Sequence, residues 1–193
     1  MANIVIVGAN QGIGYHVAKR LLELNHSVVV LDIDISNIRQ LQPRYPETLL
    51  PIVVDARRLS NIENGVKQAA GRFGSIDIAI HNACRCTFMS EPDSDYDVYR
   101  DVMDVNFFGA LRLAKTVLPY MREQKEGRII SLCEYNAAIK IAAELAGAEV
   151  ADLAAQNLRY ETLDGTHPTR AGHATIAQAW INCLGSIMPA GEE

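Results

Sequence analysis

The chain has 193 residues, of which 49% are hydrophobic and 21% charged, a composition typical of one globular domain. Its formal net charge of −5 argues against nucleic acid or an anionic membrane as the main partner, because both require clustered Lys and Arg. No export signal or long apolar run is present, and the four cysteines lack the spacing of a zinc site. We therefore expect a cytoplasmic protein with no metal.

The segment Asn3 to Gly14 reads NIVIVGANQGIG and predicts a strand that turns directly into a helix. Ile4 to Val7 is a β-branched apolar run typical of a buried parallel strand. Three glycines follow, and an amphipathic helix is expected over Tyr15 to Leu24. Such a turn leaves backbone N–H groups at a helix N-terminus free to bind a pyrophosphate.

A second predicted strand, Ser27 to Leu31, ends at Asp32, in the place where dinucleotide-binding folds carry an acid about twenty residues beyond the glycines. A carboxylate there accepts hydrogen bonds from the ribose hydroxyls of adenosine and repels a 2′-phosphate. No Arg or Lys adjoins Gln11 or Ile33. The pattern favours NAD over NADP, although Asp32 as a merely solvated strand end is the alternative.

Further elements follow in alternation and predict a doubly wound α/β fold with a parallel sheet. We expect a short polar helix, then strand, helix, strand, long helix and strand, over residues 35–44, 49–54, 60–73, 76–80, 97–123 and 127–133.

The glycine spacing G-x-x-x-G-x-G, the Asn82-Ala83 pair and Asn106 together resemble the short-chain dehydrogenase/reductase family over residues 3–133. Family members usually have Thr where this chain has Val7. The resemblance implies a dinucleotide cofactor, NAD, held by Gly8, Asn10, Gln11, Gly12, Ile13, Gly14, Asp32, Ile33, Asp55, Ala56, Asn82 and Ala83.

One of these positions, Asp55, and two further residues, Cys84 and Asn106, need separate interpretation. In the family an Asp at the place of Asp55 meets the adenine ring, whereas the same residue could be a loop carboxylate or a helix cap. Asn106 matches an asparagine that helps maintain a proton relay, and a polar residue at a bend beside Gly109 is an equal alternative. Cys84 replaces a family glycine, which implies a looser cofactor site.

The family's catalytic residues do not follow. Glu134 occupies the place of the catalytic serine, and Gly147 lies where the tyrosine of the Tyr-x-x-x-Lys pair belongs. Tyr135 and Lys140 are five residues apart, so on a helix they do not share a face as a four-residue pair does. Tyr135 is therefore only a weak candidate for the proton-transferring acid.

The segment 135–193 is instead similar to the C-terminal part of SGNH (GDSL-type) ester hydrolases. That resemblance implies that Asp164 and His167 are the acid and base of a serine triad. The turn that should carry the nucleophile reads GANQG and holds no serine. The alternative is that Asp164 and His167 are loop-forming residues, with Pro168 at the first position of the last helix.

Taken together, the patterns predict a single Rossmann-like domain over residues 1–193, a three-layer fold with strand order 3-2-1-4-5-6. Residues 135–147, 149–153 and 168–187 would supply its last helix, strand and helix. The change of resemblance favours an engineered chimera that binds NAD with little or no catalysis. An oxidoreductase with relocated proton-transfer groups and a weak esterase are the alternatives, and a monomer or an altered homodimer is expected.

Overall fold

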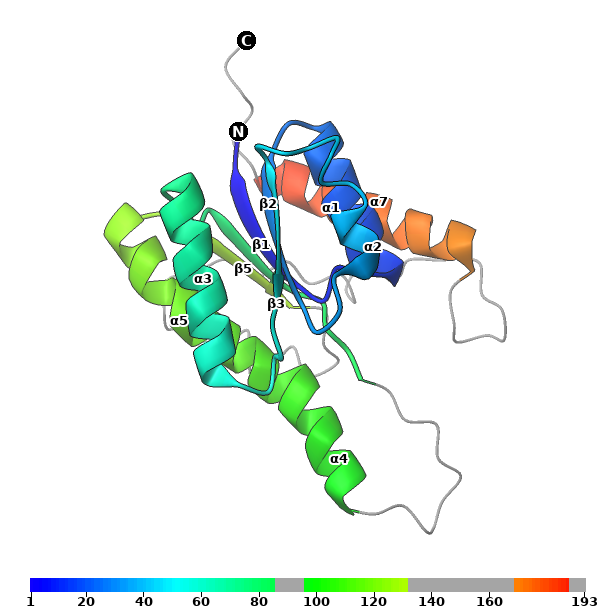
Figure 1. The fold of residues 1–193 in the computed structure, drawn as a ribbon, viewed down its shortest axis with the longest axis vertical. Coiled ribbons are helices and arrows are strands. Elements are labelled where there is room, and N and C mark those ends of the chain that lie inside the picture. The colour runs from blue at the N-terminus through cyan, green and yellow to red at the C-terminus, as the bar shows by residue number, and fades with distance from the viewer. Residues whose placement is uncertain (86–95, 132–168, 188–193) are drawn as a thin grey trace.

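The computed structural model describes residues 1–85, 96–131 and 169–187. Five parallel strands form one sheet in the order β3-β2-β1-β4-β5 (Figure 1). Their bounds are β1 (Asn3–Val7), β2 (Ser27–Asp32), β3 (Leu49–Val53), β4 (Ile78–His81) and β5 (Arg128–Ser131). The predicted parallel α/β fold is confirmed for these strands, whereas the predicted sixth strand, 149–153, and the predicted helix 135–147 lie outside the described residues.

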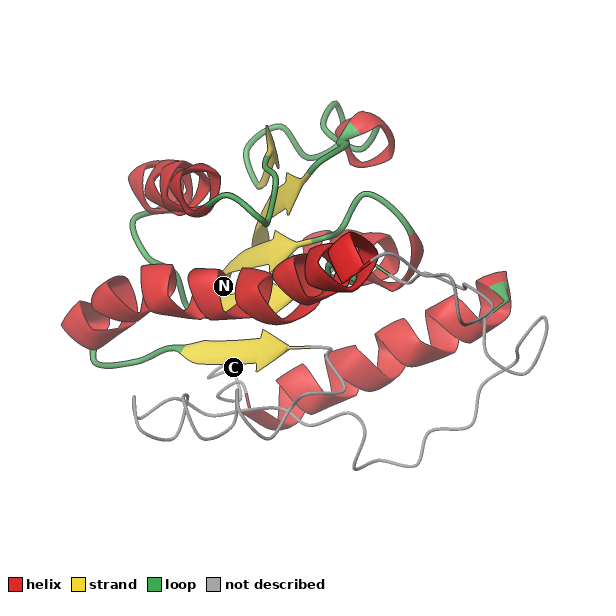
Figure 2. Cartoon of the chain, turned by 90° about the horizontal axis from the view of Figure 1, so that it is seen from below, coloured by secondary structure: helices red, strands yellow, loops and turns green. Residues whose placement is uncertain are grey.

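Helices cover both faces of the sheet (Figures 1 and 2). On one face lie α1 (Gly12–Glu23), α2 (Ser36–Arg39) and α7 (Arg170–Ile187). On the other lie α3 (Leu59–Phe73) and α5 (Gly109–Gln124), and α4 (Tyr96–Met103) with the π-helix η1 (Asp104–Phe108) leads into α5.

Alternation along β1 divides the core into two layers. Ile4 and Ile6 are fully buried in the layer that contains α1 and α7, whereas Val5 and Val7 are buried against the α3 and α5 side. Because β1 is buried on both faces, its sequence shows a continuous apolar run instead of a polar alternation.

The strand order of the sheet reverses beside β1. The chain pairs β1 with β2 on one side and with β4 on the other, so the strand order reverses between β1 and β4. In open parallel sheets, the crevice outside the carboxyl ends of the strands at such a reversal is where ligands bind.

The predicted helix over 97–123 is wrong in one respect, because a π-helical segment interrupts it at η1. The widened turn ends at Gly109, which packs against His81. A Cβ on Gly109 would lie 2.8 Å from Nε2 of His81. Single π-helical turns inside α-helices frequently occur at functional sites, and this one carries Asn106.

Two other helix boundaries differ from the prediction. The last helix begins at Arg170 and not at Pro168, because the hydroxyl of Thr169 accepts a hydrogen bond from Gly172 N–H at 3.0 Å and so caps the helix. The helix expected over 35–44 is only four residues long. Within the described ranges, no helix is both long enough and apolar enough to span a membrane.

Candidate functional site

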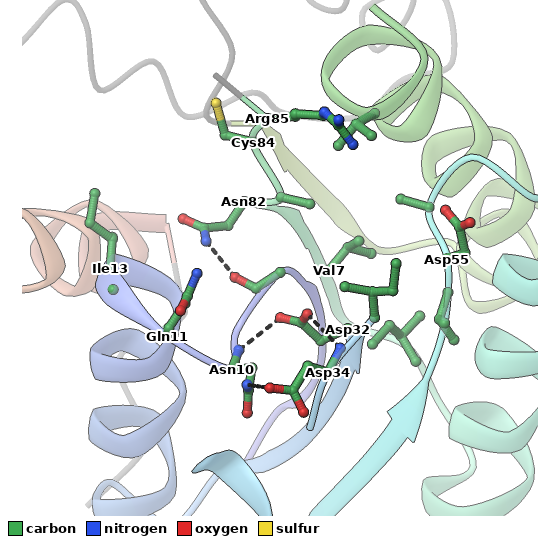
Figure 3. A pocket seen from close by; sticks show the side chains of 18 of the residues that line it. Val7, Asn10, Gln11, Ile13, Asp32, Asp34, Asp55, Asn82, Cys84 and Arg85 are labelled. Atoms are coloured by element: carbon green, nitrogen blue, oxygen red, sulfur yellow. Dashed lines mark hydrogen bonds between the residues drawn. The ribbon is translucent and has the colours of Figure 1, made fainter. Parts of the chain in front are cut away.

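A cavity of about 660 Å³ opens at the carboxyl ends of β1, β2 and β4, at the strand-order reversal (Figure 3). Its size is in the range of small-molecule and cofactor sites. Of the twelve residues predicted to bind the cofactor, eleven line it: Gly8, Asn10, Gln11, Gly12, Ile13, Asp32, Ile33, Asp55, Ala56, Asn82 and Ala83. Gly14 is the exception, and it packs instead against the Gly8 carbonyl and the Asn82 side chain.

The glycine loop is held at Gly8, where no other residue fits. Its φ of +86° is in the left-handed region, and a Cβ there would lie 2.4 Å from the backbone N of Ala83. The Asn82 side chain donates a hydrogen bond to the Gly8 carbonyl, and Asn82 N–H donates to the Val7 carbonyl at 2.8 Å. These contacts join the ends of β1 and β4 and form one wall of the cavity.

The N-terminus of α1 borders the same cavity, since Gln11, Gly12 and Ile13 line it. Gln11 is the N-cap residue and makes no side-chain cap hydrogen bond, and the first turn holds no acidic residue. Tyr15 N–H makes the first helical bond, to the Gln11 carbonyl at 3.3 Å. The N–H groups before it therefore lack a helical partner, as the first turn of any helix requires, and they suit an anion.

Asn10 ties the glycine loop to the loop after β2 (Figure 3). Its backbone N–H donates to a carboxylate oxygen of Asp32 at 2.8 Å, and its side-chain amide donates to Asp34 at 2.9 Å. Its Oδ1 accepts from the N–H groups of Asn37 and Ile38, at 2.9 and 3.0 Å. The Asn10 side chain, which is 4% exposed, is thus used to fix the loops.

Two carboxylates, Asp32 and Asp34, meet at this corner of the cavity. The backbone N–H of Ser36, followed by its hydroxyl, lowers the pKa of the Asp34 carboxyl, so it stays ionised. Because Asp32 uses one oxygen for Asn10 and accepts from Asp34 N–H only at 3.3 Å, it keeps acceptor capacity for a sugar hydroxyl. The ribose 2′-phosphate of NADP would meet two negative charges at this corner.

At the opposite side of the cavity, Asp55 is held by Arg57. The guanidinium donates to both carboxylate oxygens, with the closest N–O distance at 2.8 Å, and this pairing lowers the pKa of Asp55. Arg57 also pairs with Asp101 of α4 at 2.8 Å, and Arg85 pairs with Asp101 at 2.6 Å. Asp55 is therefore both a cavity residue and an ion-paired loop carboxylate.

Asn106 clamps the chain that leaves β4. Its Oδ1 accepts from Arg85 N–H at 2.7 Å, and its amide donates to the Arg85 carbonyl at 3.1 Å and to Cys84 Sγ at 3.6 Å. Cys84 is exposed and lines the cavity. The geometry gives Asn106 a role in shaping the backbone beside Cys84.

The other catalytic candidates, Tyr135, Asp164 and His167, lie outside the described residues. Within residues 1–85, 96–131 and 169–187, no group of three His, Cys, Asp or Glu side chains is placed to hold a metal ion.

Four charged or titratable residues of the cavity were not predicted: Asp34, Arg57, Arg85 and His173. The Asp-x-Asp spacing after β2 is a signal that could have indicated Asp34. No comparable signal exists for His173, because it reaches the cavity from α7, far along the chain.

Comparison with known proteins matches residues 2–146 to the family described as short chain dehydrogenase. The match runs past residue 133, where the resemblance was predicted to end. An uncharacterized oxidoreductase of Staphylococcus epidermidis is 28% identical over 132 residues, and a short-chain dehydrogenase of Penicillium roqueforti is 32% identical over 137 residues. These alignments cover 68% and 67% of this chain, and 57% and 54% of the relatives.

The fold is also similar to that of solved short-chain dehydrogenases. A crystal structure of a short-chain dehydrogenase from Streptomyces avermitilis superimposes with a TM-score of 0.67 and 21% identity, over 78% of this chain and 64% of that one. The matched part of this chain spans little more than half the length of these two curated relatives, 57% and 54%.

Proposed function

Because this chain belongs to the short-chain dehydrogenase family, we propose that it binds NAD(H) in the β1–α1 cavity and transfers hydride weakly or not at all. The observation that carries the proposal is the pairing of the uncapped α1 N-terminus with the Asp32 carboxylate in one cavity. The first suits the diphosphate and the second the adenosine ribose. NAD, when bound, would supply the hydride acceptor.

The preference for NAD over NADP rests on charge. A 2′-phosphate placed at Asp32 would also meet the ionised Asp34. The two guanidinium groups among the described lining residues, those of Arg57 and Arg85, are already paired with Asp55 and Asp101. The repulsion between the 2′-phosphate and the two carboxylates should therefore exceed its attraction to arginines whose charge is already neutralised by ion pairs.

Calorimetric titration of NAD, NADP and ADP-ribose into the protein tests the proposal. We expect saturable binding of NAD and ADP-ribose, with NADP at least about tenfold weaker, equivalent to about 1.4 kcal/mol. Asp32→Asn is the sharpest variant, because an amide oxygen still accepts the Asn10 N–H while the charge is lost. It should narrow the gap between NAD and NADP. Unsaturable heats for every ligand would refute the proposal.

We propose weak catalysis because the sequence after β5 does not have the family's serine and tyrosine at the positions where the resemblance expects them. Glu134 and Gly147 stand in the places of the family's serine and tyrosine. The family membership favours one second candidate, an oxidoreductase whose proton donor is relocated to Tyr135 or His167. NADH oxidation with a panel of carbonyl compounds tests it, and a rate abolished by Tyr135→Phe would establish the relocated donor.

We also propose the SGNH-like C-terminal segment, predicted over residues 135–193, and the engineered chimera. The family match overlaps the first part of that segment, up to residue 146. An esterase built on Asp164 and His167 needs a nucleophile, and no serine is among the described residues that line the cavity. Hydrolysis of a nitrophenyl ester, lost in His167→Ala, would be its signature.

Assembly is proposed from one surface. Tyr96, Tyr99 and Phe108 of the α4–η1 segment are 80%, 45% and 45% exposed, and apolar surface of this kind favours an altered homodimer over a monomer. Light scattering measures the molar mass of the wild type, expected as a dimer, and of Tyr99→Asp, expected as a monomer. The expected cytoplasmic location is likewise a proposal.

A further inference from the structure

The helix α7 packs directly against α1, although it lies outside the segment matched to the family (Figure 1). Ile176 and Ala177 of α7 are buried in the same core layer as Val17 and Leu21 of α1. This packing fixes the first turn of α7 beside the glycine loop. Thr169 caps that turn, so its position is set by its own hydrogen bonds as well as by the core.

One side chain of this turn, His173, reaches the cavity. It lines the space with Gln11, Gly12 and Ile13. A Cβ placed on Gly12 would lie 3.7 Å from Nε2 of His173. Apart from its own chain neighbours and the backbone of α1, it would meet no other described atom within 4 Å. The glycine loop thus leaves open space on its outer side, and the imidazole borders that space.

The charges around the cavity make this position distinctive. Its lining carries the three carboxylates Asp32, Asp34 and Asp55. Its two guanidinium groups are engaged by Asp55 and Asp101 on the opposite side. Among the described lining residues at the glycine end, His173 is therefore the side chain able to carry a positive charge and donate a hydrogen bond to an anion.

We propose that His173 is a binding residue for the diphosphate of the dinucleotide, donating a hydrogen bond from Nε2 to a phosphate oxygen. The α1 N-terminus supplies backbone donors from one side, and the imidazole closes the site from the other. This inference rests on the proposed function and adds to it a contact from a helix beyond the family match. It implies that the C-terminal helix contributes to cofactor affinity and not only to folding.

Titration of ligands with and without phosphate tests the contact. ADP-ribose and adenosine are titrated into the wild type, His173→Phe and His173→Gln. Phe keeps a ring against α1 but removes the donor, whereas Gln keeps an N–H donor without the charge. We expect His173→Phe to weaken ADP-ribose about tenfold, the effect of one charge-assisted hydrogen bond, with adenosine unchanged. His173→Gln should lose less affinity for ADP-ribose than His173→Phe does.

The control is Thr175→Ala on the exposed side of α7, which should bind both ligands as the wild type does. A second readout is direct: the imidazole ¹⁵N resonances of His173 should shift on addition of ADP-ribose and stay in place with adenosine. This measurement uses the wild type, so it stands even where His173→Phe fails to fold.

Three results would overturn the inference. If His173→Phe binds ADP-ribose as tightly as the wild type does, His173 makes no contact with the diphosphate. If the variant loses equal affinity for adenosine and for ADP-ribose, His173 has only a packing role. Imidazole ¹⁵N resonances of His173 that do not shift with ADP-ribose would also show that the contact is absent. Failure of the proposed function gives a different result, because the wild type would then bind no ADP-ribose at all. If the wild type binds ADP-ribose and Asp32→Asn changes the affinity but His173→Phe does not, only this inference fails.

Discussion

Asn106 holds the backbone of Arg85 by both of its polar groups, accepting from Arg85 N–H at 2.7 Å and donating to the Arg85 carbonyl at 3.1 Å. A side-chain amide that pairs in this way satisfies both backbone groups of Arg85, as a neighbouring strand would. The π-helical turn of η1 is what places Asn106 opposite Arg85, and it joins α4 and α5 to the edge of the cavity.

Removing this clamp should cost stability. Asn106→Ala removes two hydrogen bonds to the solvent-exposed backbone of Arg85, and we expect the free energy of unfolding to fall by about 1 kcal/mol, because water partly replaces the lost partners. Urea denaturation measures it. A residue that served only a proton relay would show unchanged unfolding, and this outcome would restore the relay hypothesis. Thr116→Ala, which removes only a hydroxyl bonded within α5, is the control.

Gly8 should tolerate no side chain. In Gly8→Ala the methyl group would meet the backbone of Ala83 at 2.4 Å, in a residue whose φ is +86°. We expect a loss of at least about 2 kcal/mol in unfolding free energy, and no measurable NAD binding.

Gly71 of α3 offers the matched comparison, because a Cβ there meets nothing within 4 Å. Gly71→Ala should raise stability by about 0.5–1 kcal/mol through its effect on helix propensity. Thermal melts of both variants decide the matter, and equal melting temperatures would contradict the proposed geometry of the loop.

The sequence was sufficient for features that local chemistry determines. The apolar runs at Ile4–Val7 and Ser27–Leu31 predicted two strands, the first of them buried, and the glycine spacing predicted a tight turn between strand and helix. It was not sufficient where a side chain binds a distant element. Asn10 bonds to Asp34 and His173 borders Gly12 only because the fold brings their loops and helices together.

Asp101 should link the two arginines of the cavity to each other. It pairs with Arg57 at 2.8 Å and with Arg85 at 2.6 Å, and its side chain is 23% exposed. Because both arginines are partly solvated, Asp101→Asn should cost only about 1 kcal/mol of stability at low salt. The cost should shrink at high salt, since the pairs are screened.

Urea denaturation at two salt concentrations measures this dependence. The same variant should leave Asp55 paired with Arg57, so NAD affinity should fall modestly and not disappear. Arg20→Gln, which removes the exposed pair with Glu23, is the control and should have no more than a marginal effect.

The last prediction concerns acid stability and depends on His81. The side chain is 2% exposed, its Nε2 has no hydrogen-bond partner among the described residues, and burial lowers its pKa from 6.5 to about 4. The folded protein therefore holds His81 neutral where the unfolded chain is already protonated. Because the unfolded state binds more protons between pH 6.5 and about 4, stability is full above 6.5 and falls as the pH drops through this window.

The full difference corresponds to about 3 kcal/mol of unfolding free energy. His81→Leu keeps an apolar side chain of similar size against Gly109 and removes the unpaired nitrogen, so it should flatten most of the pH dependence without lowering stability at pH 7. His26, whose pKa is lowered mainly by burial and then by the N-terminal charge, acts in the same direction, and His26→Gln should remove a smaller part. Urea denaturation from pH 7 to pH 4 compares the three proteins, and a wild-type curve as flat as that of His81→Leu would show that His81 is not held neutral by its surroundings.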